Sequence, residues 1–208
     1  MLAVVGGKGG VGKTTTALGI ARALGARGGD PVVVDADRDA PDLAATAGLD
    51  RPAPGVSDLA DGATLESAGR RHPTWQGVTL LTAIRPSIDE LRAALGRLGG
   101  RDRVVVDCPA GAGRSVAAPL RAADRSVVVS TPRPAAVRDA VKSAALAGEL
   151  GAPAAWAAVT RCRSPGTTVR RAFDRPTACV PWSETPLTES AVQSAYEAQT
   201  DRFVSRNR

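Results

Sequence analysis

Residues 4–18 read VVGGKGGVGKTTTAL, and within them residues 7–14, GKGGVGKT, fit the pattern G-x-x-x-x-G-K-[ST]. The pattern follows an apolar β-branched run and precedes an Ala- and Leu-rich segment, which predicts a strand, a glycine-rich turn and a helix. Glycines in such a turn let successive N–H groups point at one anion, and the positive end of the following helix adds to the attraction. The stretch therefore predicts a phosphate-binding loop.

Lysine is rare in this chain, which makes its use in the loop informative. Only three of the 27 Lys and Arg residues are lysine, at positions 8, 13 and 142. The lysine ammonium is compact and lies at the end of a flexible side chain, so it can make contacts that the planar guanidinium of arginine cannot make. In a loop of this kind Lys13 reaches the β and γ phosphates, and the Thr14 hydroxyl can ligate Mg²⁺. The alternative is a glycine-rich turn with incidental lysines, but it leaves the motif and its strand–helix context unexplained.

The rest of the chain alternates short β-branched runs with longer Ala- and Leu-rich segments, the pattern of βαβ units. We expect an α/β fold in three layers, a mostly parallel twisted sheet with helices on both faces, forming one domain over residues 1–208. The expected strands cover residues 2–6, 31–37, 78–82, 102–108, 125–131, 154–160 and 177–182. The expected helices cover residues 14–29, 87–99, 134–150, 167–173 and 188–204, with short helical stretches at 42–47 and 56–61.

Composition and charge limit the classes of protein to which this chain can belong. The chain is 43% hydrophobic but only 3% aromatic, which suits a core of small aliphatic side chains. A net charge of +6 favours contact with a polyanion, such as DNA or an anionic membrane surface; a solvated Arg-rich surface is the alternative. Cys108, Cys162 and Cys179 lack CxxC spacing, which indicates reduced thiols rather than a disulfide framework. We find no signal peptide and no transmembrane segment, and expect a cytoplasmic protein.

Carboxylates end two of the expected strands. Asp35 and Asp37 follow an apolar run, and Asp107 ends the run VVVD at residues 104–107. Open α/β sheets bind their ligands at such strand ends, where Asp107 can hold Mg²⁺ through water. Helix capping is the alternative for this acidic segment, and it describes Asp39 better than Asp35 or Asp37.

Three segments, KGGVGKTT (8–15), VVVDADRDAPDL (32–43) and VVVDCPAG (104–111), together resemble the MinD/ParA family of ATPases. The family has a deviant Walker A loop with an additional signature lysine, and Lys8 stands at that position. The resemblance covers about residues 1–160. It implies a P-loop ATPase with ATP and Mg²⁺ as ligands, in which Lys8 crosses a dimer interface to the partner's nucleotide. A surface lysine beside the loop is the alternative for Lys8.

The resemblance also assigns site residues. It implies catalytic roles for Lys8, Lys13 and Asp37, the last orienting the attacking water, and a magnesium shell formed by Thr14, Asp35 and Asp107. The implied nucleotide-binding residues are Gly7, Lys8, Gly9, Gly10, Val11, Gly12, Lys13, Thr14, Thr15, Thr160, Arg161 and Pro181.

The chain differs from the family at the position that contacts the nucleotide base. Family members carry an Asn at this point, whereas this chain has Thr160 followed by Arg161. A Thr lacks the paired donor and acceptor of an amide, so a preference for ATP over GTP follows from the family and not from these residues. The loop 180–187, which contains Pro181, is expected to form the wall beside the base.

The family resemblance implies an ATP-dependent homodimer that hydrolyses ATP slowly and acts as a spatial-positioning switch for a division site, a chromosome or plasmid, or another cellular structure. A protein activator, non-specific DNA and an anionic membrane are the candidate partners, so the protein could lie at the nucleoid or at the membrane periphery. Arg161, Arg163, Arg170, Arg171 and Arg175 form a candidate DNA patch. The C-terminal segment 194–208 has few large apolar residues beyond Tyr196, Phe203 and Val204, so we expect a core helix rather than a membrane anchor.

Three other functions remain open at this point. One is an ATP-dependent small-molecule ligase or kinase on the same fold. The second is an iron–sulfur carrier, which the spacing of the three cysteines does not suit. The third is a binding module that does not hydrolyse its nucleotide, against which Asp37 argues.

Overall fold

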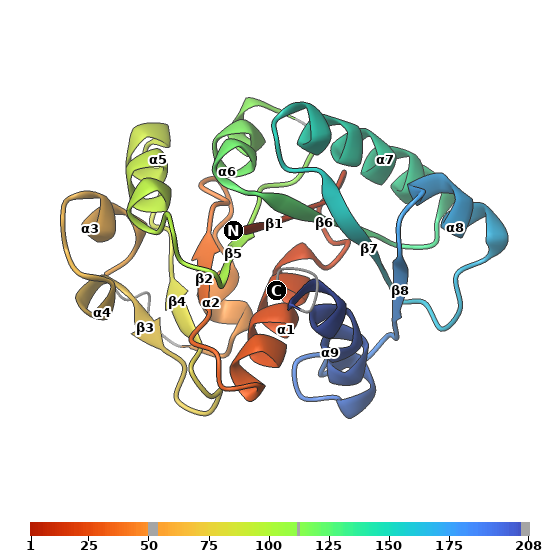
Figure 1. The fold of residues 1–208 in the computed structure, drawn as a ribbon, viewed down its shortest axis with the longest axis horizontal. Helices are drawn as coiled ribbons and strands as arrows, with labels where there is room; N and C mark the ends of the chain where they lie inside the picture. Colours follow the sequence, from red (N-terminus) through yellow and green to blue (C-terminus); the bar gives the residue numbers. More distant parts are fainter. Residues whose placement is uncertain (50–53, 112, 205–208) are drawn as a thin grey trace.

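A computed structural model describes residues 1–49, 54–111 and 113–204, and these contain one eight-stranded sheet (Figure 1). Its strand order is β3-β4-β2-β5-β1-β6-β7-β8, and every neighbouring pair is parallel except the β3–β4 pair. The strands are β1 (Leu2–Val5), β2 (Val32–Asp35), β3 (Arg70–Arg71), β4 (Thr79–Leu81), β5 (Val104–Asp107), β6 (Arg125–Ser130), β7 (Ala154–Thr160) and β8 (Thr177–Val180).

Helices cover both faces of this sheet (Figure 1). One face packs against α1 (Lys13–Ala26), α2 (Leu43–Thr46) and α9 (Ser190–Val204). The other face packs against α3 (Val56–Ala60), α5 (Ile88–Arg97), α6 (Ala117–Ala122), α7 (Pro134–Glu149) and α8 (Thr167–Phe173). The remaining short helices are α4 (Leu65–Ala68) and the 3-10 helix η1 (Arg114–Val116).

The central strands read as continuous apolar runs because both of their faces are buried. In β1, Leu2 and Val4 enter the core beside α1, whereas Ala3 and Val5 enter the core beneath α7. The expected three-layer α/β fold is therefore confirmed.

The structure also contains elements that the sequence did not predict. β3 is a two-residue antiparallel edge strand made of Arg70 and Arg71, which carry no apolar alternation. α6 contains Pro119, and a proline usually predicts that no helix forms. Pro119 lies in the first turn of α6, where the backbone N–H that proline lacks has no partner within the helix.

The C-terminal helix α9 packs on α1, as expected of a core helix. Tyr196 is fully buried, and its hydroxyl is 3.2 Å from that of Thr16 in α1. The side chains of Phe203 and Val204 lie outside the described part. Among the described helices, none combines the length and the apolar character needed to cross a membrane.

The contact between the two helices depends on Gly19, because a Cβ built there would lie 2.3 Å from the Tyr196 ring. We expect Gly19→Ala to lower the free energy of unfolding by about 1–3 kcal/mol through overpacking. Gly148→Ala in α7 is the matched control: its Cβ would meet no atom within 4 Å, so it should raise stability by about 0.5 kcal/mol. Urea denaturation of both variants measures the difference, and equal effects would contradict this account of the α1–α9 contact.

Candidate functional site

The segment 6–12 joins β1 to α1, and its conformation requires glycine at several positions. Gly10 and Gly12 have φ values of 72° and 92°, in the left-handed region that side chains rarely adopt. A Cβ at Gly7 would lie 2.3 Å from the Cβ of Asp139 in α7. The loop therefore turns tightly and lies directly against α7.

The end of β7 holds the loop from the other side. The Thr160 hydroxyl donates to the Val11 carbonyl at 2.7 Å, and the Arg161 guanidinium donates to the Gly10 carbonyl at 3.0 Å. Thr160 is buried, and the Ser130 carbonyl, at 3.2 Å, is a second acceptor for its hydroxyl. Both residues thus fix the backbone of the loop, and their predicted role beside the nucleotide base stays a prediction.

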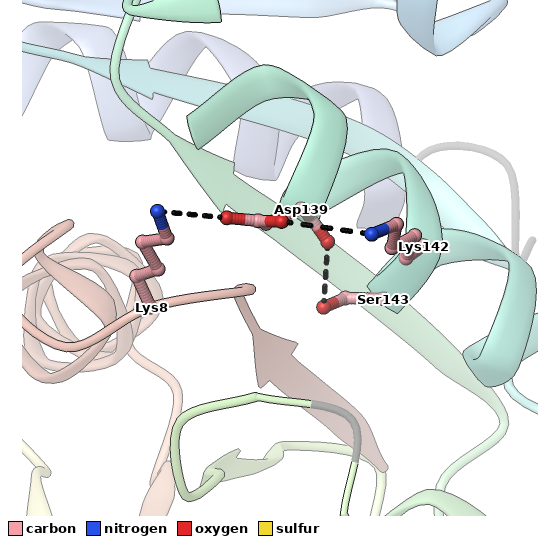
Figure 2. A network of polar contacts seen from close by, with 4 residues as sticks. All are labelled: Lys8, Asp139, Lys142 and Ser143. Carbon is pink, nitrogen blue, oxygen red and sulfur yellow. Dashed lines mark hydrogen bonds and ion pairs between the residues drawn. The ribbon is translucent and has the colours of Figure 1, made fainter. Parts of the chain in front are cut away.

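The two lysines of the loop have different surroundings. Lys13 is the first residue of α1 and is 8% exposed. The Lys8 side chain is 57% exposed, and its Nζ pairs with an Asp139 carboxylate oxygen at 3.1 Å (Figure 2). Lys142 lies 4.0 Å from the other oxygen of Asp139, so two ammonium groups share one carboxylate. Lys13 is buried at the start of α1, whereas Lys8 projects from the loop toward α7.

Parallel strand register brings the predicted carboxylates together. Asp35 at the end of β2 pairs in register with Asp107 at the end of β5, and both are 1% exposed. Burial, together with the neighbouring Asp107, raises the pKa of Asp35 to about 8. Burial also raises the pKa of Asp107 to about 7, against the opposing effects of the Thr14 hydroxyl and the Lys13 ammonium.

Asp35 and Asp37 also brace the segment that follows β2. Asp35 accepts hydrogen bonds from the N–H groups of Asp37 at 3.0 Å and Leu43 at 3.3 Å. One oxygen of Asp37 accepts from the N–H groups of Asp39 and Ala40. The expectation that capping would describe Asp39 better than Asp35 is wrong, because it is Asp35 that binds the first N–H of α2.

The oxygens at these strand ends suit a hard divalent cation. In the described part of the chain, Oδ1 of Asp107 is buried without a hydrogen-bond partner. The Thr14 hydroxyl donates to Asp42 at 2.9 Å and so lies at the edge of this cluster of acidic side chains. Mg²⁺ prefers such oxygen ligands and commonly takes only one or two from the protein, with substrate phosphates and water as the rest. A cation here would satisfy the unpaired oxygen of Asp107.

Two contacts of the site were absent from the sequence predictions. Asp139 is 131 positions from Lys8, and an Asp inside a helix gives no sign of such a partner. The contact of Thr160 with Val11 likewise depends on the tertiary structure. Pro181 follows β8, and the N–H of Cys162 binds the Val180 carbonyl, so the loop 180–187 lies beside the end of β7.

Comparison with known proteins places this chain in a family. Residues 2–171 match the family model described as the CobQ/CobB/MinD/ParA nucleotide binding domain. The septum site-determining protein MinD of Synechocystis sp. is 30% identical over 149 residues, which cover 67% of this chain and 56% of that protein. The chain thus spans little more than half the length of that relative.

Solved structures share the fold. MinD of Pyrococcus horikoshii, complexed with Mg-ADP, has a TM-score of 0.86 at 24% identity and covers 99% of this chain and 96% of its own. Cobyrinic acid a,c-diamide synthase of Mycobacterium smegmatis, with bound ADP and magnesium, has a TM-score of 0.77 at 24% identity, with 99% and 94% covered. Because the family model matches residues 2–171, which are most of the chain, this chain belongs to the CobQ/CobB/MinD/ParA nucleotide-binding family.

Proposed function

We propose that the chain binds Mg-ATP, dimerises on ATP and hydrolyses it slowly, so that it acts as a switch that positions a cellular structure. Residues 7–14 would cradle the phosphates, with the buried Lys13 against the β and γ phosphates. Thr14 and Asp107 would hold Mg²⁺, which neutralises phosphate charge when bound. The unpaired Oδ1 of Asp107 supports this assignment. The names of the relatives, MinD among them, support the positioning role.

The observation that carries the dimer proposal is the placement of Lys8. Its side chain is 57% exposed and projects from the loop to α7, whereas Lys13 is buried. A second ammonium placed at the surface beside a phosphate site can serve an anion that belongs to another subunit. On dimerisation, Lys8 would leave Asp139 and bind the phosphates of the partner's nucleotide.

Asp37 is the residue proposed to orient the attacking water. Two backbone N–H groups hold one of its carboxylate oxygens, which fixes the orientation of the carboxylate at the edge of the site. A positioned carboxylate of this kind can align water for attack on the γ phosphate.

A second candidate function is ATP-dependent ligation of a small molecule. The fold shared with cobyrinic acid a,c-diamide synthase supports it. A ligase needs only the phosphate lysine, Lys13, and a substrate pocket, so Lys8 would be dispensable. Stimulation of ATP turnover by a metabolite in a monomeric protein would favour this candidate over the positioning switch.

Substitution of the two loop lysines separates binding from dimerisation. We expect Lys13→Ala to weaken ATP binding about 10- to 100-fold, because a charged hydrogen-bond donor to phosphate is lost. Lys8→Ala should bind ATP within about threefold of the wild type but stay monomeric and inactive. Equilibrium binding, size-exclusion chromatography with ATP or ADP, and phosphate release measure these effects. Normal turnover by monomeric Lys8→Ala would contradict the proposal.

Removal of the carboxylate that holds Lys8 should have the opposite effect on dimerisation. An ion pair with this exposure is worth about 0.2–1 kcal/mol, so Asp139→Asn should strengthen ATP-dependent dimerisation about 1.4- to fivefold for each pair that no longer has to be broken. Lys142→Ala, one turn further along α7, is the control and should give no gain, because it leaves the Lys8–Asp139 pair intact. Analytical ultracentrifugation with a non-hydrolysable ATP analogue measures both. Weaker dimerisation of Asp139→Asn would count against the exchange of partners.

The buried carboxylates predict a pH dependence of stability. Because the folded-state pKa values of Asp35 and Asp107 lie above that of an unfolded Asp, the folded protein binds more protons from about pH 4 to pH 8. The metal-free protein should therefore lose stability as the pH rises through this range. Asp107→Asn should raise the Tm by several degrees at pH 8 and by much less at pH 5. The exposed Asp89→Asn is the control, and an equal gain at both pH values would refute the assignment.

We propose that the dimer binds DNA. Arg161, Arg163, Arg170, Arg171 and Arg175 are all exposed around α8, with Asp174 as the acidic residue among them. Binding through phosphate contacts should require ATP and fall steeply between 50 and 200 mM salt. Co-sedimentation with DNA and with anionic liposomes measures this, and a salt-insensitive result would favour a protein partner.

A further inference from the structure

Two of the three cysteines meet at the edge of the sheet. Cys179 lies in β8, in register with Val159 of β7, and Cys162 follows the end of β7. The Cys162 N–H continues the ladder by donating to the Val180 carbonyl at 3.1 Å. The Cys179 thiol donates to the Cys162 sulfur, and the two Sγ atoms are 2.8 Å apart. A disulfide bond of about 2.05 Å would require a movement of less than about 1 Å.

The two thiols differ in accessibility. Cys162 is 6% exposed and packs in the same core cluster as Val169 and Phe173 of α8. Cys179 lies at the edge of that cluster and is half-buried. A reagent in solution therefore meets Cys179 first, and Cys162 lies behind it as a second thiol.

The surroundings of the pair are positively charged. Five arginines of the segment 161–175 are exposed, and the charge of Arg170 acts directly on Cys179. An anionic disulfide would be attracted to this surface, whereas a cationic one would be repelled. Glutathione disulfide is a small anionic disulfide of this kind.

We propose that Cys162 and Cys179 form a reversible dithiol–disulfide site that reacts with glutathione disulfide. Cys179 loses its proton, and its thiolate attacks one sulfur of the reagent, which releases one glutathione thiolate. Cys162, deprotonated in turn, attacks the Cys179 sulfur and releases the second. The protein thiols lose two electrons, and one glutathione disulfide becomes two glutathione molecules, which take up the two protons. The bridge would lie one residue from Arg161, which holds the loop at Gly10.

The rate of this reaction should depend on pH. Burial and the neighbouring Cys162 thiol raise the pKa of Cys179 to about 12, and Arg170 opposes the shift. Only the thiolate is a nucleophile, so the initial rate should increase about tenfold for each unit between pH 7 and pH 9.

The experiment treats the purified full chain with glutathione disulfide at pH 7 and pH 9, blocks free thiols with an alkylating reagent and maps the products by mass spectrometry after trypsin digestion. We expect a link between the peptide of Cys162 and the peptide of Cys179 within one chain, reversed by dithiothreitol, with Cys108 alkylated only after unfolding. Full alkylation of Cys162 and Cys179, stable glutathione on wild-type Cys179, or a link between chains would overturn the proposal.

Single substitutions test the order of the two steps. Cys162→Ser should retain glutathione on Cys179, because the resolving thiol is absent. Cys179→Ser should leave Cys162 unmodified, because that thiol is buried. Cys108→Ser, at a buried core position just after β5, should behave as the wild type. Circular dichroism establishes that each variant is folded, and modification of Cys162 in folded Cys179→Ser would contradict the proposed order.

Discussion

The candidate site depends on how closely the glycine-rich loop 6–12 packs between α7 and the end of β7. Only a glycine at position 7 lets the loop lie against Asp139, and Thr160 and Arg161 fix the loop by binding its carbonyl groups. A loop held at its carbonyls from outside is preorganised, so an anion does not have to order the backbone when it binds. The same packing places Lys8 at the surface and Lys13 in the interior. The division of roles proposed for the two lysines therefore follows from the backbone of the loop.

Two buried carboxylates are the second constraint. Parallel register brings Asp35 and Asp107 side by side at 1% exposure, where burial disfavours the charged form of each and neighbouring carboxylates add to the effect. Asp35 is partly compensated by two backbone N–H groups, but Oδ1 of Asp107 has no partner within the described residues. A site of this kind stores unfavourable electrostatic energy that a cation relieves. In the proposed magnesium site, stability without metal and affinity for metal would thus be linked through the same atoms.

The sequence predicted the features that depend on local patterns. Glycine spacing in residues 7–14 and the apolar runs before Asp35 and Asp107 were sufficient for the loop, the strands and their shared edge. Contacts between distant segments could not be predicted, because nothing near Asp139 indicates Lys8 and nothing near Cys162 indicates Cys179. The spacing of the cysteines indicated reduced thiols, yet parallel pairing of β7 with β8 brings two of them together. The short β3 escaped prediction because its arginines give no alternation.

The proposed exchange of partners by Lys8 is made easier by Lys142. If Asp139 were held by Lys8 alone, the departure of Lys8 would leave a carboxylate that is 26% exposed without a counter-charge. Lys142 is 4.0 Å from the other carboxylate oxygen, so Asp139 keeps a partner after Lys8 leaves. A single exposed ion pair contributes about 0.2–1 kcal/mol, which is small beside the attraction of an ammonium to a triphosphate in a dehydrated interface. The lone chain can therefore hold Lys8 in one orientation without opposing strongly its transfer to a second subunit.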